Sequence, residues 1–186
     1  VDHPLDGDRI ARIYGEWLAF FSSGEAAGFR MDPVKQDGYF SLREAEHAKG
    51  FVERDFKEYF QFYPWGRCPE SLQVDLASHF DAAVELGAEL LSCIARSLPE
   101  TRSGEWVSVP HSPGQLIVNI GDMLQEATGG YLPSTSHRVA TPDAEQPAVS
   151  RMSLPLFLHP RPDVVLSPRY TARQYLMQRL DELGVA

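Results

Sequence analysis

Apolar residues recur at helical spacing in three stretches of the chain. Over residues 8–21 they fall three or four positions apart, which predicts a helix capped by Asp6 or Asp8. A longer helix is predicted over 71–98, and a third over 171–184, which opens with a capping box. The stripe expected to be buried on the long helix is Leu72, Leu76, Phe80, Ala83, Gly87, Leu90, Leu91, Ile94 and Leu98.

Short strand-like stretches dominate the second half of the chain. Turn signals such as Gly129-Gly130 separate them. The predicted strands cover residues 105–109, 115–120, 134–139 and 151–159. In the first half, residues 56–63 are strand-like and end at a turn over 64–67, and a capping box at Ser41 predicts a short helix that Gly50 can end.

This order of elements predicts a mainly β fold with flanking helices. Antiparallel strands that follow one another closely usually close as a jelly roll or a sandwich. The length of 186 residues suits one domain. We expect a single domain over 1–186, with a mainly helical part over 1–99, jelly-roll strands over 104–168 and a C-terminal helix over 171–184.

The charge balance argues against several kinds of partner. Seventeen basic and 26 acidic residues give a net charge of −9 and form no basic patch, so we expect no nucleic-acid partner. No run of 18 apolar residues is present, and the first residues lack the pattern of a signal peptide. Two cysteines make no disulfide framework. We therefore expect a cytoplasmic protein without a membrane partner, and the sequence does not specify an oligomeric state.

The predicted strand over 151–159 carries candidate binding chemistry. Because strands have a period of two, Arg151 and Ser153 share one face, and Met152 and Leu154 share the other. A guanidinium and a hydroxyl that face the same space can bind a carboxylate. The alternative is a solvated face of the sheet that binds nothing.

His137 is a candidate metal ligand on the preceding predicted strand. His137 and Arg138 point to opposite faces of an extended chain, and an inward-facing imidazole can offer a neutral nitrogen to a metal. A lone histidine is more often structural. The nearby Arg151–Ser153 pair favours the ligand interpretation.

These motifs together resemble one family. Asn119-x-Gly121-Asp122, Ser134-x-x-His137-Arg138-Val139 and Arg151-x-Ser153 follow one another in an order that is specific, although each motif alone is weak. The segment over 104–168 is similar to the C-terminal half of the isopenicillin N synthase-like, Fe(II)- and 2-oxoglutarate-dependent oxygenases.

The resemblance implies a fold, two cofactors and residue roles. The fold would be a double-stranded β-helix, a form of jelly roll. His137 would be the distal ligand of Fe(II), and Arg151 and Ser153 would bind the far carboxylate of 2-oxoglutarate. The implied activity is oxidation of a small-molecule substrate by hydroxylation, desaturation or cyclisation, with release of succinate and CO2. The alternative is a catalytically inactive jelly-roll binding protein that lacks the full iron triad.

One part of the family pattern is missing from the chain. The first two iron ligands, a His-x-Asp pair, should lie on a strand between the long helix and Gly104, but only Glu100 to Ser103 separate them. We therefore expect that the chain joins segments of a longer protein at about 99–104. His79 and Asp81 are a literal His-x-Asp, but residues two apart on a helix point about 200° apart, which excludes them as a chelating pair.

The turn over 64–67 offers two further candidates. Trp65 and Arg67 are predicted to contact substrate if this turn covers the site. The alternative is a packed aromatic turn. Cys68 and Cys93 are expected to be free thiols, with Cys93 near the core face of the long helix.

Overall fold

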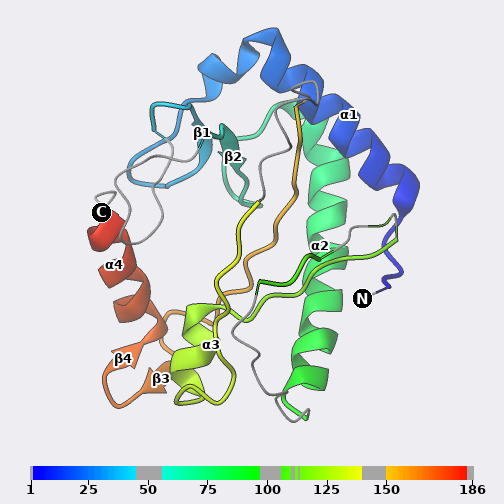
Figure 1. The fold of residues 1–186 in the computed structure, drawn as a ribbon. Coiled ribbons are helices and arrows are strands. Elements are labelled where there is room, and N and C mark those ends of the chain that lie inside the picture. Colours follow the sequence, from blue (N-terminus) through cyan, green and yellow to red (C-terminus); the bar gives the residue numbers. More distant parts are fainter. Residues whose placement is uncertain are drawn as a thin grey trace. The chain divides into compact units, whose positions relative to one another are not determined.

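The computed structural model describes residues 2–44, 56–96, 106–109, 112, 114–139 and 150–183. Helices and short strands alternate along them (Figure 1). In chain order the elements are α1 Gly7–Ser23, the 3-10 helix η1 Glu25–Phe29, β1 Gly38–Phe40, β2 Tyr59–Gln61, α2 Glu70–Ile94, α3 Asp122–Ala127, β3 Val165–Ser167, β4 Tyr170–Thr171 and α4 Ala172–Leu183.

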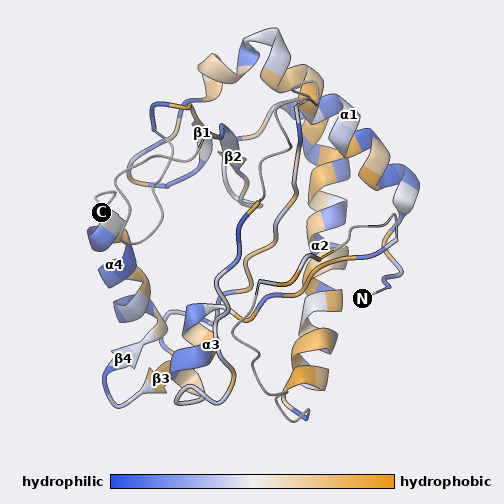
Figure 2. Ribbon diagram, viewed as in Figure 1, coloured by the Kyte–Doolittle hydropathy of each residue, from blue (hydrophilic) through white to orange (hydrophobic). Residues whose placement is uncertain are grey.

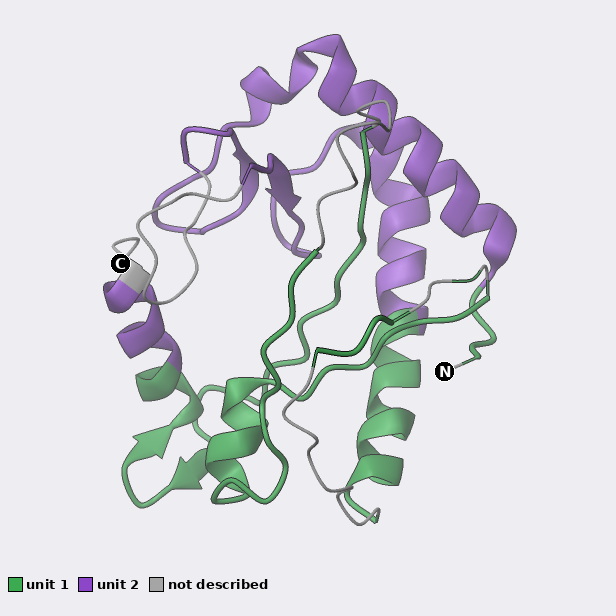
Figure 3. Ribbon diagram, in the orientation of Figure 1, with its two compact units in different colours: residues 1–5, 83–175 green, residues 6–82, 176–186 purple. Residues whose placement is uncertain are grey.

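The chain divides into two compact units (Figure 3). Unit 1 consists of residues 1–5 and 83–175, and unit 2 consists of residues 6–82 and 176–186. Helix α1 and the first part of α2, residues 70–82, therefore belong to unit 2, and the rest of α2 belongs to unit 1. His137, Arg151 and Ser153 all belong to unit 1.

Helix α1 forms where the periodicity predicted a helix. The Asp6 carboxylate accepts hydrogen bonds from the backbone N–H groups of Asp8 and Arg9 at 3.0 and 3.1 Å, so Asp6 is the cap. Gly24, with φ of 81°, ends the helix in the left-handed conformation. The predicted apolar face is buried at Ile13, Trp17 and Phe20. These side chains begin the core of unit 2.

Strands β1 and β2 complete that core with aromatic side chains. They pair antiparallel, with Gly38 opposite Gln61. The ring of Phe60 lies 4.9 Å from Trp17 in an edge-to-face contact, a geometry that adds about 0.5–1.5 kcal/mol beyond area burial. Strand β2 lies within the predicted 56–63 stretch, whereas β1 lacks a clear alternating pattern and was not predicted.

Helix α2 confirms the long predicted helix and corrects part of its buried stripe. Leu72 and Leu76 are buried, and Asp75 accepts hydrogen bonds from the Arg12 guanidinium of α1 at 2.8 and 3.2 Å. Leu91, by contrast, is 45% exposed, and Cys93 is exposed rather than near a core face. Figure 2 shows apolar residues along much of this helix. Its last turns therefore present apolar side chains that the described chain does not cover.

The strands predicted for the second half do not form a sheet in the described residues. The described parts of 105–109, 115–120, 134–139 and 151–159 are irregular chain, apart from an isolated bridge between Asp2 and Gln115. A strand is held by hydrogen bonds to a neighbour, and within the described residues these segments join neither of the two sheets. Their apolar side chains are correspondingly exposed, as at Ile117 (58%) and Phe157 (76%).

Three elements of unit 1 and the last helix are regular. The sequence did not predict α3, a helix of six residues, or the antiparallel β3–β4 hairpin. Helix α4 matches the prediction for 171–184, and the backbone N–H of Thr171 donates to Gln174 Oε1 at 2.8 Å as a capping box requires.

The short helix predicted after Ser41 falls mostly outside the described residues. Ser41 does donate to Glu44, at 2.9 Å from its backbone N–H and 2.8 Å from its hydroxyl, and residues 42–44 form a turn. Among the described helices, none combines the length and the apolar character needed to cross a bilayer.

Candidate functional site

A short helix and a double-glycine turn lead into the segment that carries His137. After α3, Gly129 and Gly130 adopt φ of 60° and 87°, which reverses the chain at little steric cost. The Gly130 N–H returns to the Gln125 main-chain oxygen at 2.9 Å. The Ser134 N–H donates to the Gln125 side-chain oxygen at 2.7 Å. The turn predicted at these glycines is confirmed, and it defines where the His137 segment begins.

The His137 imidazole is exposed and lies close to the backbone of Thr135. Its Nδ1 lies 3.2 Å from the carbonyl oxygen of Thr135. A carbonyl oxygen only accepts hydrogen bonds, so this contact is compatible with a proton on Nδ1. The neighbouring Arg138 guanidinium lies 4.6 Å from the centre of the Trp106 ring. Exposure leaves the imidazole accessible, and its role as a metal ligand stays a prediction.

Arg151 and Ser153 alternate with apolar residues as the sequence predicts. Both are exposed, whereas Met152 and Leu154 between and after them are partly buried. The alternation is present although no ladder hydrogen bonds hold this segment. An exposed guanidinium and an exposed hydroxyl can each donate to a carboxylate.

The three predicted residues do not form a closed constellation. Within the described residues, no hydrogen bond or ion pair joins His137, Arg151 and Ser153 to one another, and no group of three His, Cys, Asp or Glu side chains could hold a metal ion. A catalytic Fe(II) of this kind needs two histidines and a carboxylate. Among the described residues the sequence predicts only one such ligand, His137, so they do not by themselves make an iron site. The expected join at 99–104 lies outside the described residues.

His79 and Asp81 both lie in α2, as the exclusion of this pair assumed. Asp81 is exposed and His79 is partly buried. Their separation by two helical residues keeps them from sharing one ion.

Trp65 and Arg67 lie in a well-defined turn of unit 2. The Trp65 ring, 77% exposed, stacks on Tyr63 with centroids 5.3 Å apart. The Arg67 backbone N–H donates to the buried Asp37 carboxylate at 2.7 Å, and its guanidinium donates to the Arg30 carbonyl oxygen at 2.5 Å. These are contacts of a packed turn, and contact with substrate stays a prediction for both residues.

The neighbouring thiol is unsuited to nucleophilic chemistry. Burial raises the pKa of Cys68 to about 11, so the thiol stays protonated at neutral pH.

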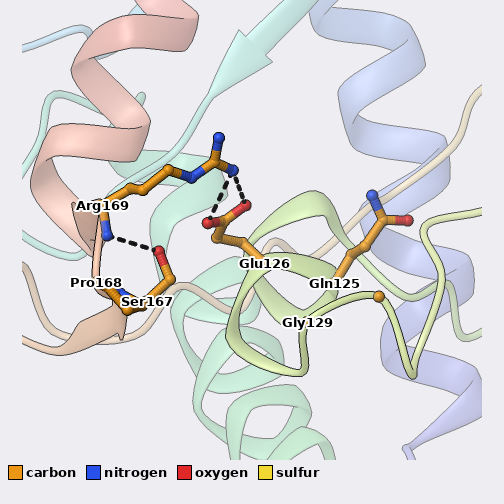
Figure 4. Close-up of a pocket in the computed structure, with 7 residues that line it drawn as sticks. Gln125, Glu126, Gly129, Ser167, Pro168 and Arg169 are labelled. Atoms are coloured by element: carbon orange, nitrogen blue, oxygen red, sulfur yellow. Dashed lines mark hydrogen bonds and ion pairs between the residues drawn. The ribbon is translucent and has the colours of Figure 1, made fainter.

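An open hollow of about 410 Å³ lies beside α3 in unit 1 (Figure 4). The Arg169 guanidinium donates to both oxygens of Glu126, at 3.1 and 3.0 Å. Hydrogen bonds from Ser167, and then the charge and hydrogen bonds of Arg169, hold the pKa of Glu126 below its usual value. These contacts fasten α3 to the β3–β4 hairpin. Neither His137 nor Arg151 lines this hollow. Its two charged lining residues, Glu126 and Arg169, form an ion pair with each other.

Sequence reasoning missed Gln125, Glu126 and Asp37. Gln125 and Glu126 lie in α3, and a helix of six residues is too short to show a hydrophobic period. Asp37 stands beside Gly38 and looks like an ordinary turn residue. Each acquires its role from a partner that is distant in sequence or lies beyond a turn, so no local pattern could have identified them.

Comparison with known proteins defines the class. A family model described as the 2OG-Fe(II) oxygenase superfamily matches residues 58–160, which include His137, Arg151 and Ser153. A putative oxygenase from Shewanella oneidensis of known structure superposes with a TM-score of 0.82 at 36% identity, covering 99% of this chain and 89% of that one. The chain therefore belongs to the 2OG-Fe(II) oxygenase superfamily.

Two curated plant relatives show how much of such a protein the chain represents. Feruloyl CoA ortho-hydroxylase 2 of Arabidopsis thaliana is 34% identical over 110 residues, which are 58% of this chain and 28% of that protein. The 1-aminocyclopropane-1-carboxylate oxidase homolog 2 of the same plant is 37% identical over 159 residues, which are 85% of this chain and 37% of that protein. The chain thus matches between about a quarter and two fifths of the length of these two relatives.

Membership confirms the resemblance that the motifs indicated. The superfamily uses Fe(II) and 2-oxoglutarate as co-substrate. Together with the oxygenase neighbour, it implies a jelly-roll fold, although the described residues contain few paired strands.

Proposed function

We propose that the protein is an Fe(II)- and 2-oxoglutarate-dependent oxygenase that oxidises a small molecule, with release of succinate and CO2. The observation that carries the proposal is the family match over 58–160, since this segment contains His137 and the Arg151–Ser153 pair. Its core would be a double-stranded β-helix, to which the segments over 115–120, 134–139 and 151–159 would contribute strands. The first two iron ligands would lie in residues that the chain lacks at about 99–104.

The proposed roles follow from the donor atoms. His137 would supply the third iron ligand, and we propose Nε2 as the ligating atom because Nδ1 lies 3.2 Å from the Thr135 carbonyl oxygen. Arg151 would bind the far carboxylate of 2-oxoglutarate through its guanidinium, with the Ser153 hydroxyl as a further donor. When bound, iron and 2-oxoglutarate would supply the oxidising chemistry, and the chain would orient them and exclude water.

The names of relatives favour one of the possible outcomes. The feruloyl CoA ortho-hydroxylase and the scopoletin 8-hydroxylase of Arabidopsis thaliana, the latter 35% identical over 107 residues, are both named as hydroxylases of small molecules. Hydroxylation of a small molecule is therefore the outcome we propose first, ahead of desaturation or cyclisation. A cytoplasmic location and the lack of a nucleic-acid partner stay predictions.

Binding of 2-oxoglutarate by the full-length protein tests the assignment of the Arg151 segment. Arg151→Ala should weaken 2-oxoglutarate binding by about 2–5 kcal/mol, the cost of truncating one partner of a desolvated charge pair. Isothermal titration with Mn(II) in place of Fe(II) measures this affinity without turnover. Arg161→Ala is the matched control, because Arg161 is an exposed arginine of the same unit whose side chain lies 3.7 Å from Asp163.

An unchanged affinity in Arg151→Ala would overturn this assignment. Failure of the natural protein to bind 2-oxoglutarate at all would favour the inactive binding protein instead. Loss of affinity in Arg161→Ala equal to that in Arg151→Ala would indicate a general effect of charge.

A further inference from the structure

Gln125 accepts hydrogen bonds from the double-glycine turn and from the residues that follow it. The main-chain oxygen of Gln125 accepts from the Gly130 N–H at 2.9 Å, and its side-chain oxygen accepts from the Ser134 N–H at 2.7 Å. The second bond is partly buried and lies at the short end of the range for N–H···O bonds. Helix α3 and the residues before His137 are thereby joined through one side chain.

Ser134 is the last such fixed point before His137. Within the described residues, no backbone hydrogen bond ties 135–139 to another segment. The three residues from Ser134 to His137 span at most about 10 Å of chain. Beyond Ser134, the contacts that remain are the Thr135–His137 bond and the Arg138 side chain over Trp106. The position of the His137 backbone therefore depends strongly on where Ser134 is held.

Helix α3 is itself anchored on its other side. Glu126, the residue after Gln125, is bound by Ser167 and Arg169 of the β3–β4 hairpin. Figure 4 shows the Gln125 side chain directed away from the Glu126–Arg169 pair. The β3–β4 hairpin thus binds α3 through Glu126, and α3 in turn binds the segment before His137 through the Gln125 amide oxygen.

We propose that Gln125 is a positioning residue for His137, acting through the hydrogen bond from the Ser134 N–H to its amide oxygen. The inference rests on the proposed function for the meaning of His137 as a ligand. The hydrogen bond itself can be tested without metal or substrate.

Three variants of the full-length protein separate this role from general stability. Gln125→Leu removes the acceptor at similar size, whereas Gln125→Glu keeps an acceptor oxygen at the same place. Gln174→Leu is the matched control, because the Gln174 side-chain oxygen also accepts a backbone N–H, that of Thr171 at 2.8 Å, at the start of α4. Thermal unfolding confirms that each variant is folded.

The readouts are metal-free first. Hydrogen exchange of the Ser134 amide and the imidazole resonances of His137, assigned with a His137→Asn variant, are compared by NMR. Gln125→Leu should accelerate exchange at Ser134 and shift the His137 resonances, Gln125→Glu should restore both, and Gln174→Leu should change neither. Mn(II) affinity should fall about tenfold to a hundredfold in Gln125→Leu alone, as for other groups that orient a ligand.

Two results would overturn the proposal. One is a Gln125→Leu protein whose Ser134 exchange and His137 resonances match the wild type. The other is an equal change in Gln174→Leu. If the wild-type protein binds no Mn(II), the proposed function fails, while the two metal-free measurements still decide the role of Gln125.

Discussion

At the scale of residues, Asp37 shows how a single charge can organise a turn thirty positions away. Among the described residues it is the only charged side chain that is fully buried. It accepts the Arg67 N–H at 2.7 Å, and the Arg67 Nε lies 3.7 Å from its other oxygen. A Cβ on Gly66 would lie 2.9 Å from the same carboxylate, so the turn approaches Asp37 too closely for another residue there. The contacts of Asp37 with Gly66 and Arg67 therefore stabilise the turn over 64–67.

Asp37→Ala should lower the free energy of unfolding by about 1–3 kcal/mol, because it leaves the Arg67 N–H without its acceptor. Urea denaturation measures the change. Asp163→Ala is the control, since Asp163 is 79% exposed and 3.7 Å from Arg161, and it should change stability by less than about 0.5 kcal/mol. A stability for Asp37→Ala equal to that of the control would contradict the role given to Asp37.

The environment of a residue could be predicted from the sequence only where it depends on neighbouring positions in the chain. The alternation of Arg151 and Ser153 with Met152 and Leu154 follows from the period of an extended chain, and the exposure pattern agrees with it. The burial of Asp37 depends on a turn after β2. No pattern around residue 37 contains that information.

At the scale of elements, one close contact fixes the far end of the Arg151 segment. Gly87 in α2 is buried, and a Cβ there would clash with the Leu158 side chain. Both residues belong to unit 1. The glycine therefore lets the segment that carries Arg151 and Ser153 lie directly on the helix.

Gly87→Ala should destabilise the protein by about 1–3 kcal/mol through overpacking, and Leu158→Ala should relieve the clash in the double variant. Gly15→Ala is the control, since nothing lies within 4 Å of a Cβ at that exposed helical position. That change should be neutral or stabilising by up to about 1 kcal/mol. Additive effects of Gly87→Ala and Leu158→Ala would show that the two residues are not in contact.

Helices were predicted better than strands for a physical reason. The hydrogen bonds of α1 and α2 lie within each helix, so their periodicity and caps are local. A strand needs a neighbour, and among the described residues the segments predicted as strands over 115–120 and 151–159 belong to neither of the two sheets; Gln115 forms only an isolated bridge to Asp2. Helix α3 was missed because six residues are too few to show a period.

At the scale of the whole molecule, the combination of motifs identified the superfamily where no single motif could. The family model that matches residues 58–160, in both compact units, is that of the same superfamily. The iron site could not be completed from the sequence, because only one ligand, His137, was predicted among the described residues and the remaining two were expected at 99–104.

The most direct test of the account is succinate release by the full-length natural protein supplied with Fe(II), 2-oxoglutarate and oxygen, measured beside its His137→Ala variant. Release should require both iron and oxygen, should be abolished in His137→Ala and should be retained in Arg161→Ala. Release that persists in His137→Ala would contradict the assignment of the ligand. Absence of iron-dependent release from the wild-type protein would contradict the proposed activity itself.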